Sequence, residues 1–392
     1  MSSTMAFEME TFDLETLISD RARSIDVSGI RRVFELGAKL EKPINLSIGQ
    51  PDFPVPDALK QAAVAAILGD RNGYTLTQGV PELVASIRTH LRKDVGWNLD
   101  GGDLNAIVTT GTSGGLQLAM LALLNPGEEV IAGDPYFVAY EPMVKIAGGK
   151  FVPVDCYPDF RLTAERVESV ITSRTKIVIV GSPGNPSGVV LNSQELRELV
   201  ELCESRGILI VSDEIYDEFT YADARENGRC PSPARISERT LLIRGFGKTY
   251  GCTGWRLGYV AGPKTLIQQI AKLQQYTFVC APSALQVAVA HAFDVDMSPV
   301  IARYAERRNL VERELGSVTN VTHPGGAFYA FVEVPKRLKM TATEFCEKAI
   351  SKNVLVIPGR VFSRRDTHFR LSYAVSDESL AMGLSILKSL MQ

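Results

Sequence analysis

The stretch "KIVIVGSPGNPSGVVLNSQELRELVELCESRGILIVSDEIY" (176–216) decides the fold class. Residues 176–181 form an apolar, β-branched run, and residues 207–213 form a second run of the same kind. Between them, residues 192–207 follow a helical period. Four side chains of that helix share one apolar face: Leu196, Leu199, Val200 and Cys203. A strand, a helix and a strand in this order predict a βαβ unit with parallel strands.

Similar β-rich runs flank this unit, each ending in Gly, Pro, Asp or a polar residue. They are "NAIVTTG" (105–111), "EEVIAGDPY" (128–136), "RTLLIRGFGK" (239–248) and "GWRLGYVAG" (254–262). Their apolar residues are consecutive rather than alternating, which is typical of strands in a sheet covered on both faces. In such a sheet, ligands bind outside the carboxyl ends of the strands. We therefore expect an α/β fold with a mainly parallel sheet and its chemistry at that edge.

The last hundred residues have a different pattern of predicted strands and helices. Two β-like runs, "GGAFYAFVEV" (325–334) and "NVLVIPG" (353–359), stand among helical stretches. This pattern predicts a smaller α+β domain over residues 291–392, after a large domain over 46–290. We expect residues 1–45 to pack on the small domain.

Composition narrows the class of protein. The 392 residues carry a formal net charge of −3, which gives no reason to expect nucleic acid or an anionic membrane as a partner. The first twenty residues hold five acidic side chains and no Lys or Arg, the wrong charge for a targeting segment. No apolar run approaches the ~18 residues that a membrane span needs. We therefore expect a cytoplasmic enzyme.

Cysteine and histidine usage gives no sign of a metal. The 6 cysteines include no CxxC pair, and none of the 4 histidines is near another. In a chain of this length, scattered cysteines indicate reduced thiols. We expect no metal site.

The sequence "RGFGKTYGCTGWRLGY" (244–259) carries a lysine just past a predicted strand. It fails the P-loop and dinucleotide-binding patterns, because the glycines those motifs require are missing. A desolvated Lys248 near cationic neighbours can form a Schiff base with an aldehyde. Arg256 presents a planar donor fork that suits a phosphate. An aldehyde that is also a phosphate ester is pyridoxal phosphate, although Lys248 alone fits a surface lysine better.

Three further segments favour the cofactor. Asp213 ends an apolar strand, where a carboxylate can keep a pyridine nitrogen protonated, or can simply cap a turn. Asn185 of "SPGNPSG" can donate to a phenolic oxygen or serve a tight turn. "TTGTSGG" (109–115) leads into a helix whose N–H groups can hold a phosphate, and capping is compatible with that role.

The chain resembles the class I/II aminotransferases, pyridoxal-phosphate enzymes of fold type I. The resemblance spans roughly residues 40 to 375 and rests on five motifs in the family's order: "GVPEL" (79–83), "NPSG" (185–188), "DEIY" (213–216), "KTYGCTGWRLGY" (248–259) and "RLSYA" (370–374). It implies a seven-stranded sheet in the large domain.

The resemblance also implies residue roles at the cofactor. Lys248 would bond the aldehyde and then move the proton, while Asp213 would pair with the ring nitrogen. The other predicted cofactor contacts are Thr112, Ser113 and Arg256 at the phosphate, Asn185 and Tyr216 at the phenolic oxygen, Phe137 on the ring face, and Tyr74 at the phosphate of a neighbouring subunit. Core packing is the simpler role for Phe137.

Substrate contacts follow from the same resemblance. Arg370 would bind the α-carboxylate, with Gly49 and Asn185 beside it, although a salt-bridged arginine is the simpler role for Arg370. The shared Tyr74 implies a homodimer with shared active sites. One departure concerns the family's frequent S-x-S-K pattern, where this chain has Gly245 and Gly247.

Three functions compete. The first is an aminotransferase that moves an amino group from an L-amino acid to a 2-oxo acid in a ping-pong reaction. The second is a C–S lyase or another eliminase with the same cofactor contacts, and the third is a non-catalytic binding protein on this fold. The motifs do not reveal which amino acid and 2-oxo acid are used.

Overall fold

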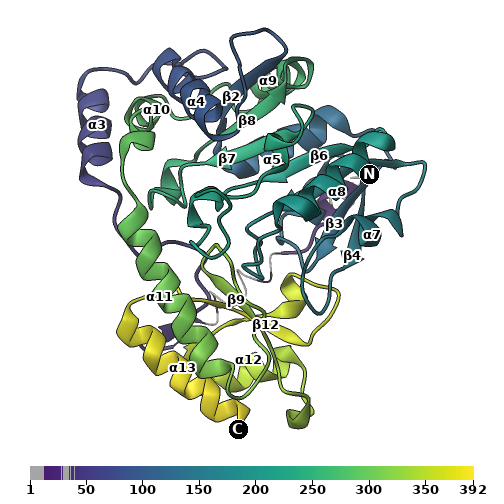
Figure 1. The fold of residues 1–392 in the computed structure, drawn as a ribbon, viewed down its shortest axis with the longest axis vertical. Helices are drawn as coiled ribbons and strands as arrows, with labels where there is room; N and C mark the ends of the chain where they lie inside the picture. Colours follow the sequence, from purple (N-terminus) through teal and green to yellow (C-terminus); the bar gives the residue numbers. More distant parts are fainter. Residues whose placement is uncertain (1–12, 28, 30–34, 36, 39) are drawn as a thin grey trace, which may run out of the picture.

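A seven-stranded sheet forms the larger part of the molecule (Figure 1). The computed structural model describes residues 13–27, 29, 35, 37, 38 and 40–392. The strand order is β2-β8-β7-β6-β5-β3-β4. The strands are β2 (Leu104–Thr110), β3 (Glu129–Asp134), β4 (Lys150–Asp155), β5 (Thr175–Gly181), β6 (Leu209–Asp213), β7 (Leu241–Gly245) and β8 (Leu257–Pro263).

The sheet is mainly parallel, which confirms the predicted fold class. Strands β3 to β7 run parallel to one another, whereas β8 is antiparallel to both of its neighbours, β2 and β7. Parallel strands place their carboxyl ends at one edge. The loops that follow β5, β6 and β7 therefore meet at that edge.

Alternate residues of β5 explain why its apolar run is unbroken. Ile177 and Ile179 join the core formed with α5 and α9, while Val178 and Val180 join the core formed with α7 and α8. Both faces of the strand are thus buried, as the consecutive pattern predicts. The helices around this sheet are α3 (Asp57–Leu68), α4 (Pro81–Asp94), α5 (Gly111–Leu123), α6 (Tyr140–Ile146), α7 (Ala164–Glu168), α8 (Ser193–Ser205), α9 (Lys264–Thr277) and α10 (Ser283–Val289).

Helix α8 confirms the helix that the sequence predicts over residues 192–207. All four predicted face residues are buried: Leu196, Leu199, Val200 and Cys203. The helix begins with a capping box, in which the Asn192 side chain accepts from the Glu195 N–H and the Glu195 carboxylate accepts from the Asn192 N–H. Such a box satisfies two N–H groups that have no partner within the helix.

The C-terminal part has its own three-stranded antiparallel sheet, in the order β11-β12-β9. Figure 1 shows it below the larger sheet, flanked by the last helices. Its elements are α11 (Ser298–Leu315), β9 (Tyr329–Glu333), α12 (Ala342–Ile350), β11 (Ile357–Pro358), β12 (His368–Ser372) and α13 (Asp377–Met391). The domain limits at 45/46 and 290/291 stay a prediction.

The N-terminal segment touches both parts of the molecule. Strand β1 (Ile44–Asn45) pairs in parallel with β10 (Val354–Leu355) of the C-terminal part. Helix α1 (Asp20–Arg23) contacts α6 beside the larger sheet. The predicted packing of residues 1–45 on the small domain falls partly outside the described residues, and it stays a prediction.

Candidate active site

A cavity of about 380 Å³ opens at the carboxyl ends of the central strands. Residues from the loops after β5, β6 and β7 line it, together with the start of α5 and with strands β9 and β12. Ten of the eleven predicted site residues are among its lining: Gly49, Thr112, Ser113, Phe137, Asn185, Asp213, Tyr216, Lys248, Arg256 and Arg370. Segments far apart in the sequence thus converge on one space.

Lys248 extends from the loop that follows β7. Its Nζ donates a hydrogen bond to the Gly49 carbonyl and lies 5.9 Å from the centre of the Phe328 ring. Burial, and then the positive charges of Arg370 and Arg256, lower the pKa of Lys248 to about 8. A lowered pKa leaves more of the amine uncharged near neutral pH, and only the uncharged amine is a nucleophile.

Asp213 is the last residue of β6 and is buried. Burial raises the pKa of its carboxyl to about 6, although the hydrogen bond from the Tyr140 hydroxyl, at 2.8 Å from Oδ2, acts in the opposite direction. The sequence did not single out Tyr140 as a site residue. A buried carboxylate without a cationic partner can bind and stabilise a protonated ring nitrogen.

The first turn of α5 and Arg256 form an anion-binding corner. The helix begins at Gly111, so the N–H groups of Thr112 and Ser113 have no acceptor within the helix. Gly111 has φ +69°, and a Cβ there would lie 2.7 Å from one terminal nitrogen of Arg256. The positive φ favours glycine, and a side chain there would also displace the guanidinium of Arg256. A helix N-terminus beside a guanidinium suits a phosphate group.

Arg370 lies in the middle of β12 and is 1% exposed. One terminal nitrogen donates to Asn185 Oδ1 at 3.1 Å and the other to the Ser47 carbonyl at 2.8 Å, while the buried Nε has no partner among the residues that the structure describes. Burial lowers the pKa of Arg370. Because these acceptors are uncharged, the guanidinium charge is available for an anionic ligand.

Tyr216 and Tyr329 face each other at the cavity wall. Their hydroxyl oxygens are 3.0 Å apart, and both rings are buried. Phe137 also lines the cavity and meets Tyr140 edge to face, with 5.6 Å between ring centres. The sequence pattern does not mark Tyr329 as a site residue, because an aromatic residue in a β-run fits the core equally well.

Tyr74 lies outside this cavity and is 89% exposed. Within the single chain it contributes nothing to the space around Lys248. Its predicted role at a neighbouring subunit's phosphate therefore stays a prediction.

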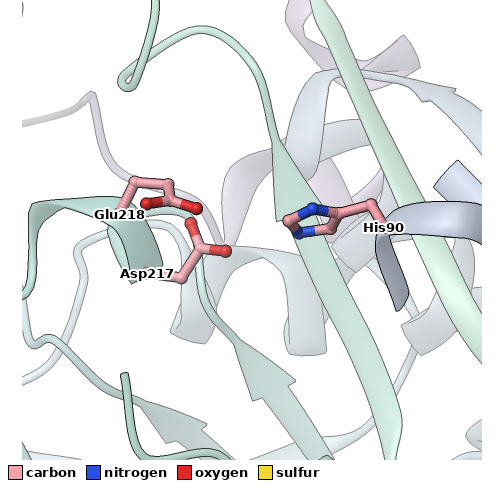
Figure 2. Close-up of side chains that lie close together, drawn as sticks. All are labelled: His90, Asp217 and Glu218. Atoms are coloured by element: carbon pink, nitrogen blue, oxygen red, sulfur yellow. The ribbon is translucent and has the colours of Figure 1, made fainter. Parts of the chain in front are cut away.

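A second cluster of ionisable side chains lies apart from the cavity lining (Figure 2). His90 of α4 points toward Asp217 and Glu218, and their ligand atoms lie within 4.8 Å of one another. The Nε of Arg244 is 3.1 Å from Asp217, and a terminal nitrogen is 3.4 Å from His90 Nε2. This guanidinium supplies the positive charge that a metal ion would bring, so the cluster carries no argument for a metal.

The donor set of the cavity fits pyridoxal phosphate. It offers an amine of lowered pKa, a buried carboxylate for a ring nitrogen, and a helix N-terminus with an arginine for a phosphate. Because the acceptors around Arg370 are uncharged, its guanidinium can also bind a second anion, the carboxylate of a substrate.

Comparisons with known proteins agree with this chemistry. The family model "Aminotransferase class I and II" matches residues 41–387. The chain is 34% identical over 373 residues to the aspartate aminotransferase of Pyrococcus abyssi, covering 93% of this chain and 95% of that protein. An aromatic-amino-acid aminotransferase of Thermococcus litoralis is equally similar, at 34% identity over 373 residues with the same coverage.

Solved structures show the same relationship. The aspartate aminotransferase of Thermotoga maritima superposes with a TM-score of 0.87 at 32% identity, covering 95% of this chain and 99% of that one. These relatives are all named aminotransferases, so they support transamination and not the elimination alternative. The chain belongs to the class I and II aminotransferases, the pyridoxal-phosphate-dependent transferases of fold type I.

Proposed function

We propose that this enzyme moves an amino group from an L-amino acid to a 2-oxo acid in a ping-pong reaction, with Lys248 as the residue that bonds the cofactor. One observation carries the assignment. Lys248 is the lysine that lines the cavity, and burial with two neighbouring arginines lowers its pKa to about 8. When bound, the cofactor supplies the electron-withdrawing ring that stabilises charge at the substrate's α-carbon.

The chain's own residues hold the cofactor at three points. Arg256 and the first N–H groups of α5 would hold the phosphate, and Asp213 would hold the ring nitrogen. Asn185 and Tyr216 donate to the phenolic oxygen. These contacts fix the ring in one orientation, which is a large part of what an enzyme contributes to cofactor chemistry.

The substrate's α-carboxylate binds Arg370. A guanidinium whose hydrogen-bond acceptors are uncharged gains a charge-assisted, two-pronged hydrogen bond from that carboxylate. Gly49 and Asn185 complete the binding surface. Lys248 would then act as the base that takes the proton from the substrate's α-carbon and delivers it to the carbon that was the cofactor's aldehyde.

We propose a homodimer because large apolar side chains are exposed on α3, on the segment that follows it and at the end of α9. They are, by exposed fraction, Tyr74 (89%), Tyr276 (86%), Leu68 (79%), Leu76 (68%) and Val64 (55%). Large apolar patches on a protein surface are typical of an interface with another protein. Sedimentation of the wild type should give a dimer, and Leu68→Glu with Tyr276→Glu should shift it toward the monomer with loss of activity. A fully active wild-type monomer would contradict shared active sites.

A cytoplasmic location agrees with the absence of disulfides among the cysteines, all of which the structure describes. All six cysteines are free in the structure, and disulfides are rare in reducing compartments.

The preferred donor is tested with a panel of amino acids against 2-oxoglutarate and pyruvate. Aspartate and the aromatic amino acids come first, because relatives are named for them.

Lys248→Ala tests the assignment. We expect a folded protein whose turnover falls by at least about 10³-fold, because the proton transfer loses its base. Lys272→Ala, an exposed lysine of α9, is the matched control and should keep full activity. Undiminished turnover of Lys248→Ala would disprove the role.

A half-reaction separates transamination from elimination. Loaded wild-type enzyme mixed with an amino acid alone should release one equivalent of 2-oxo acid and then stop. Continuous release would indicate a lyase.

A further inference from the structure

Tyr329 is the first residue of β9 and lies opposite Ser372 of β12 in the antiparallel sheet. It lines the cavity and is 1% exposed. Strand pairing and burial fix its position, so its ring and its hydroxyl keep constant neighbours. Those neighbours are two residues with different expected roles, Arg370 and Tyr216.

The ring of Tyr329 packs against the guanidinium of Arg370. The Cζ atom of Arg370 is 4.5 Å from the centre of the Tyr329 ring and 4.6 Å from the centre of the Phe362 ring. Two hydrogen bonds to uncharged oxygens and one unpartnered Nε complete the guanidinium's surroundings. Since no carboxylate of the described residues holds this group, the aromatic faces contribute much of what sets its plane.

The hydroxyl of Tyr329 is 3.0 Å from that of Tyr216, and either oxygen can donate in this pair. The proposed function decides the direction. If Tyr216 donates its single proton to the phenolic oxygen of the cofactor, then Tyr329 must donate to Tyr216. A tyrosine that accepts one hydrogen bond donates a stronger one, because hydrogen bonds in a chain polarise each other.

The same hydroxyl is also close to the segment that contacts Lys248. A Cβ on Gly49 would lie 3.0 Å from the Tyr329 hydroxyl oxygen, and the Gly49 carbonyl accepts the hydrogen bond from Lys248. Tyr329 therefore lies where the predicted cofactor contacts and the predicted substrate contacts meet.

We propose that Tyr329 is a positioning residue with two separable actions: its ring orients Arg370 toward the substrate's carboxylate, and its hydroxyl strengthens the hydrogen bond that Tyr216 donates to the cofactor. The inference rests on the proposed function, because it assumes that pyridoxal phosphate occupies the cavity. It assigns no direct chemistry to Tyr329.

Tyr329→Phe separates the two actions, because it keeps the ring and removes the hydroxyl. We expect KM for the amino donor to stay within about twofold and kcat to fall about 5- to 10-fold, the size of one hydrogen bond. The pH midpoint of the bound cofactor's visible absorption should rise by several tenths of a unit, because the phenolic oxygen loses stabilisation. Tyr329→Leu removes the ring as well, and KM should then rise about tenfold.

The chain contains a matched control pair. Tyr221 and Tyr373 are also buried, with hydroxyl oxygens 3.1 Å apart, but they lie outside the cavity lining. Tyr373→Phe should leave KM, kcat and the absorption midpoint unchanged. If Tyr329→Phe has the same kcat and the same absorption midpoint as Tyr373→Phe, the action of the hydroxyl is disproved. If KM of Tyr329→Leu equals that of Tyr329→Phe, the action of the ring is disproved.

Failure of the proposed function looks different. In that case the wild type itself would acquire no visible absorption on addition of pyridoxal phosphate. Thermal unfolding of all three variants without cofactor identifies any that fail to fold, and Tyr329→Phe, which keeps every ring contact, is the variant that decides the role of the hydroxyl.

Discussion

Arg244 and Arg370 are both buried arginines, yet their surroundings are opposite. Arg244, 2% exposed, forms salt bridges with Asp94, Glu214 and Asp217. Burial opposes the charge of Arg244, but Asp217 and Glu214 outweigh it and raise its pKa. Arg370 has no carboxylate among its hydrogen-bond partners in the described part of the chain, and burial lowers its pKa.

The difference separates a structural charge from a functional one. Burying an ion costs several kcal/mol unless a partner compensates it. At Arg244 the fold itself supplies the compensation. At Arg370 the described residues supply no such compensation, which supports our proposal that an anion from solution binds there. A buried charge without a counter-charge therefore marks a binding site better than the charge alone.

Arg244→Met should have the largest effect, and on stability. It leaves Glu214 and Asp217 buried without their cation, which should lower the free energy of unfolding by about 3–5 kcal/mol. Urea unfolding measures the change, with Arg239→Met, an exposed arginine, as control. Equal stability of the two variants would show that the cluster is not structural.

Arg370→Met should change activity rather than stability. We expect kcat/KM to fall about 100-fold, or about 2.7 kcal/mol, because the substrate's carboxylate loses its charged partner. The free energy of unfolding without substrate should stay equal or rise, because an uncompensated buried charge is removed. Destabilisation as large as that of Arg244→Met would break the distinction between the two arginines.

Lys248→Met should stabilise the cofactor-free protein at pH 7 by an amount on the order of 3 kcal/mol. The folded pKa of Lys248, about 8, lies below its ordinary 10.5, so the folded state binds this proton more weakly than the unfolded state. Below pH 8 the full cost is present, and it disappears as pH rises to 10.5. Urea unfolding of both proteins across this range should show the wild type approaching the variant, and a constant difference would contradict the lowered pKa.

Gly245→Ser should have the smallest effect, on cofactor affinity. A Cβ on Gly245 would lie 2.9 Å from the Thr112 methyl and 2.8 Å from Ile215 Cδ1, so Thr112 must move from the predicted phosphate corner. We expect about tenfold weaker binding, or about 1.4 kcal/mol, in a pyridoxal phosphate titration. Adding Thr112→Ser removes the methyl and should restore part of the loss. No recovery would mean that the two positions act independently.

The sequence predicted those parts of the site that follow from strand order. Asp213 and Lys248 each come at or just after the carboxyl end of a strand, and parallel strands bring such ends together. Strand β4 was missed because Pro153 interrupts a short run, and β12 because Arg370 lies in its centre. Charged and proline residues obscure a strand pattern when tertiary contacts satisfy them.

The sequence could not predict which distant residues the buried tyrosines contact. Tyr140 reaches Asp213, and Tyr329 reaches Tyr216 113 positions away. Periodicity indicates that such residues are buried, but not which buried groups meet. Arg370 was predicted only because its motif resembles the family's, since a salt-bridged arginine fits the local pattern equally well.

The hydrogen bonds of Arg370 also bear on how the enzyme acquires its site. Its guanidinium joins Ser47 near β1, Asn185 after β5, and its own strand in the C-terminal sheet. The anion-binding corner at α5, by contrast, belongs wholly to the larger sheet. The phosphate contact that we propose thus needs only the larger sheet, whereas the proposed carboxylate contact needs both parts of the molecule. Because a ligand stabilises only the state that binds it, the cofactor and the substrate report on the completion of different parts of the molecule.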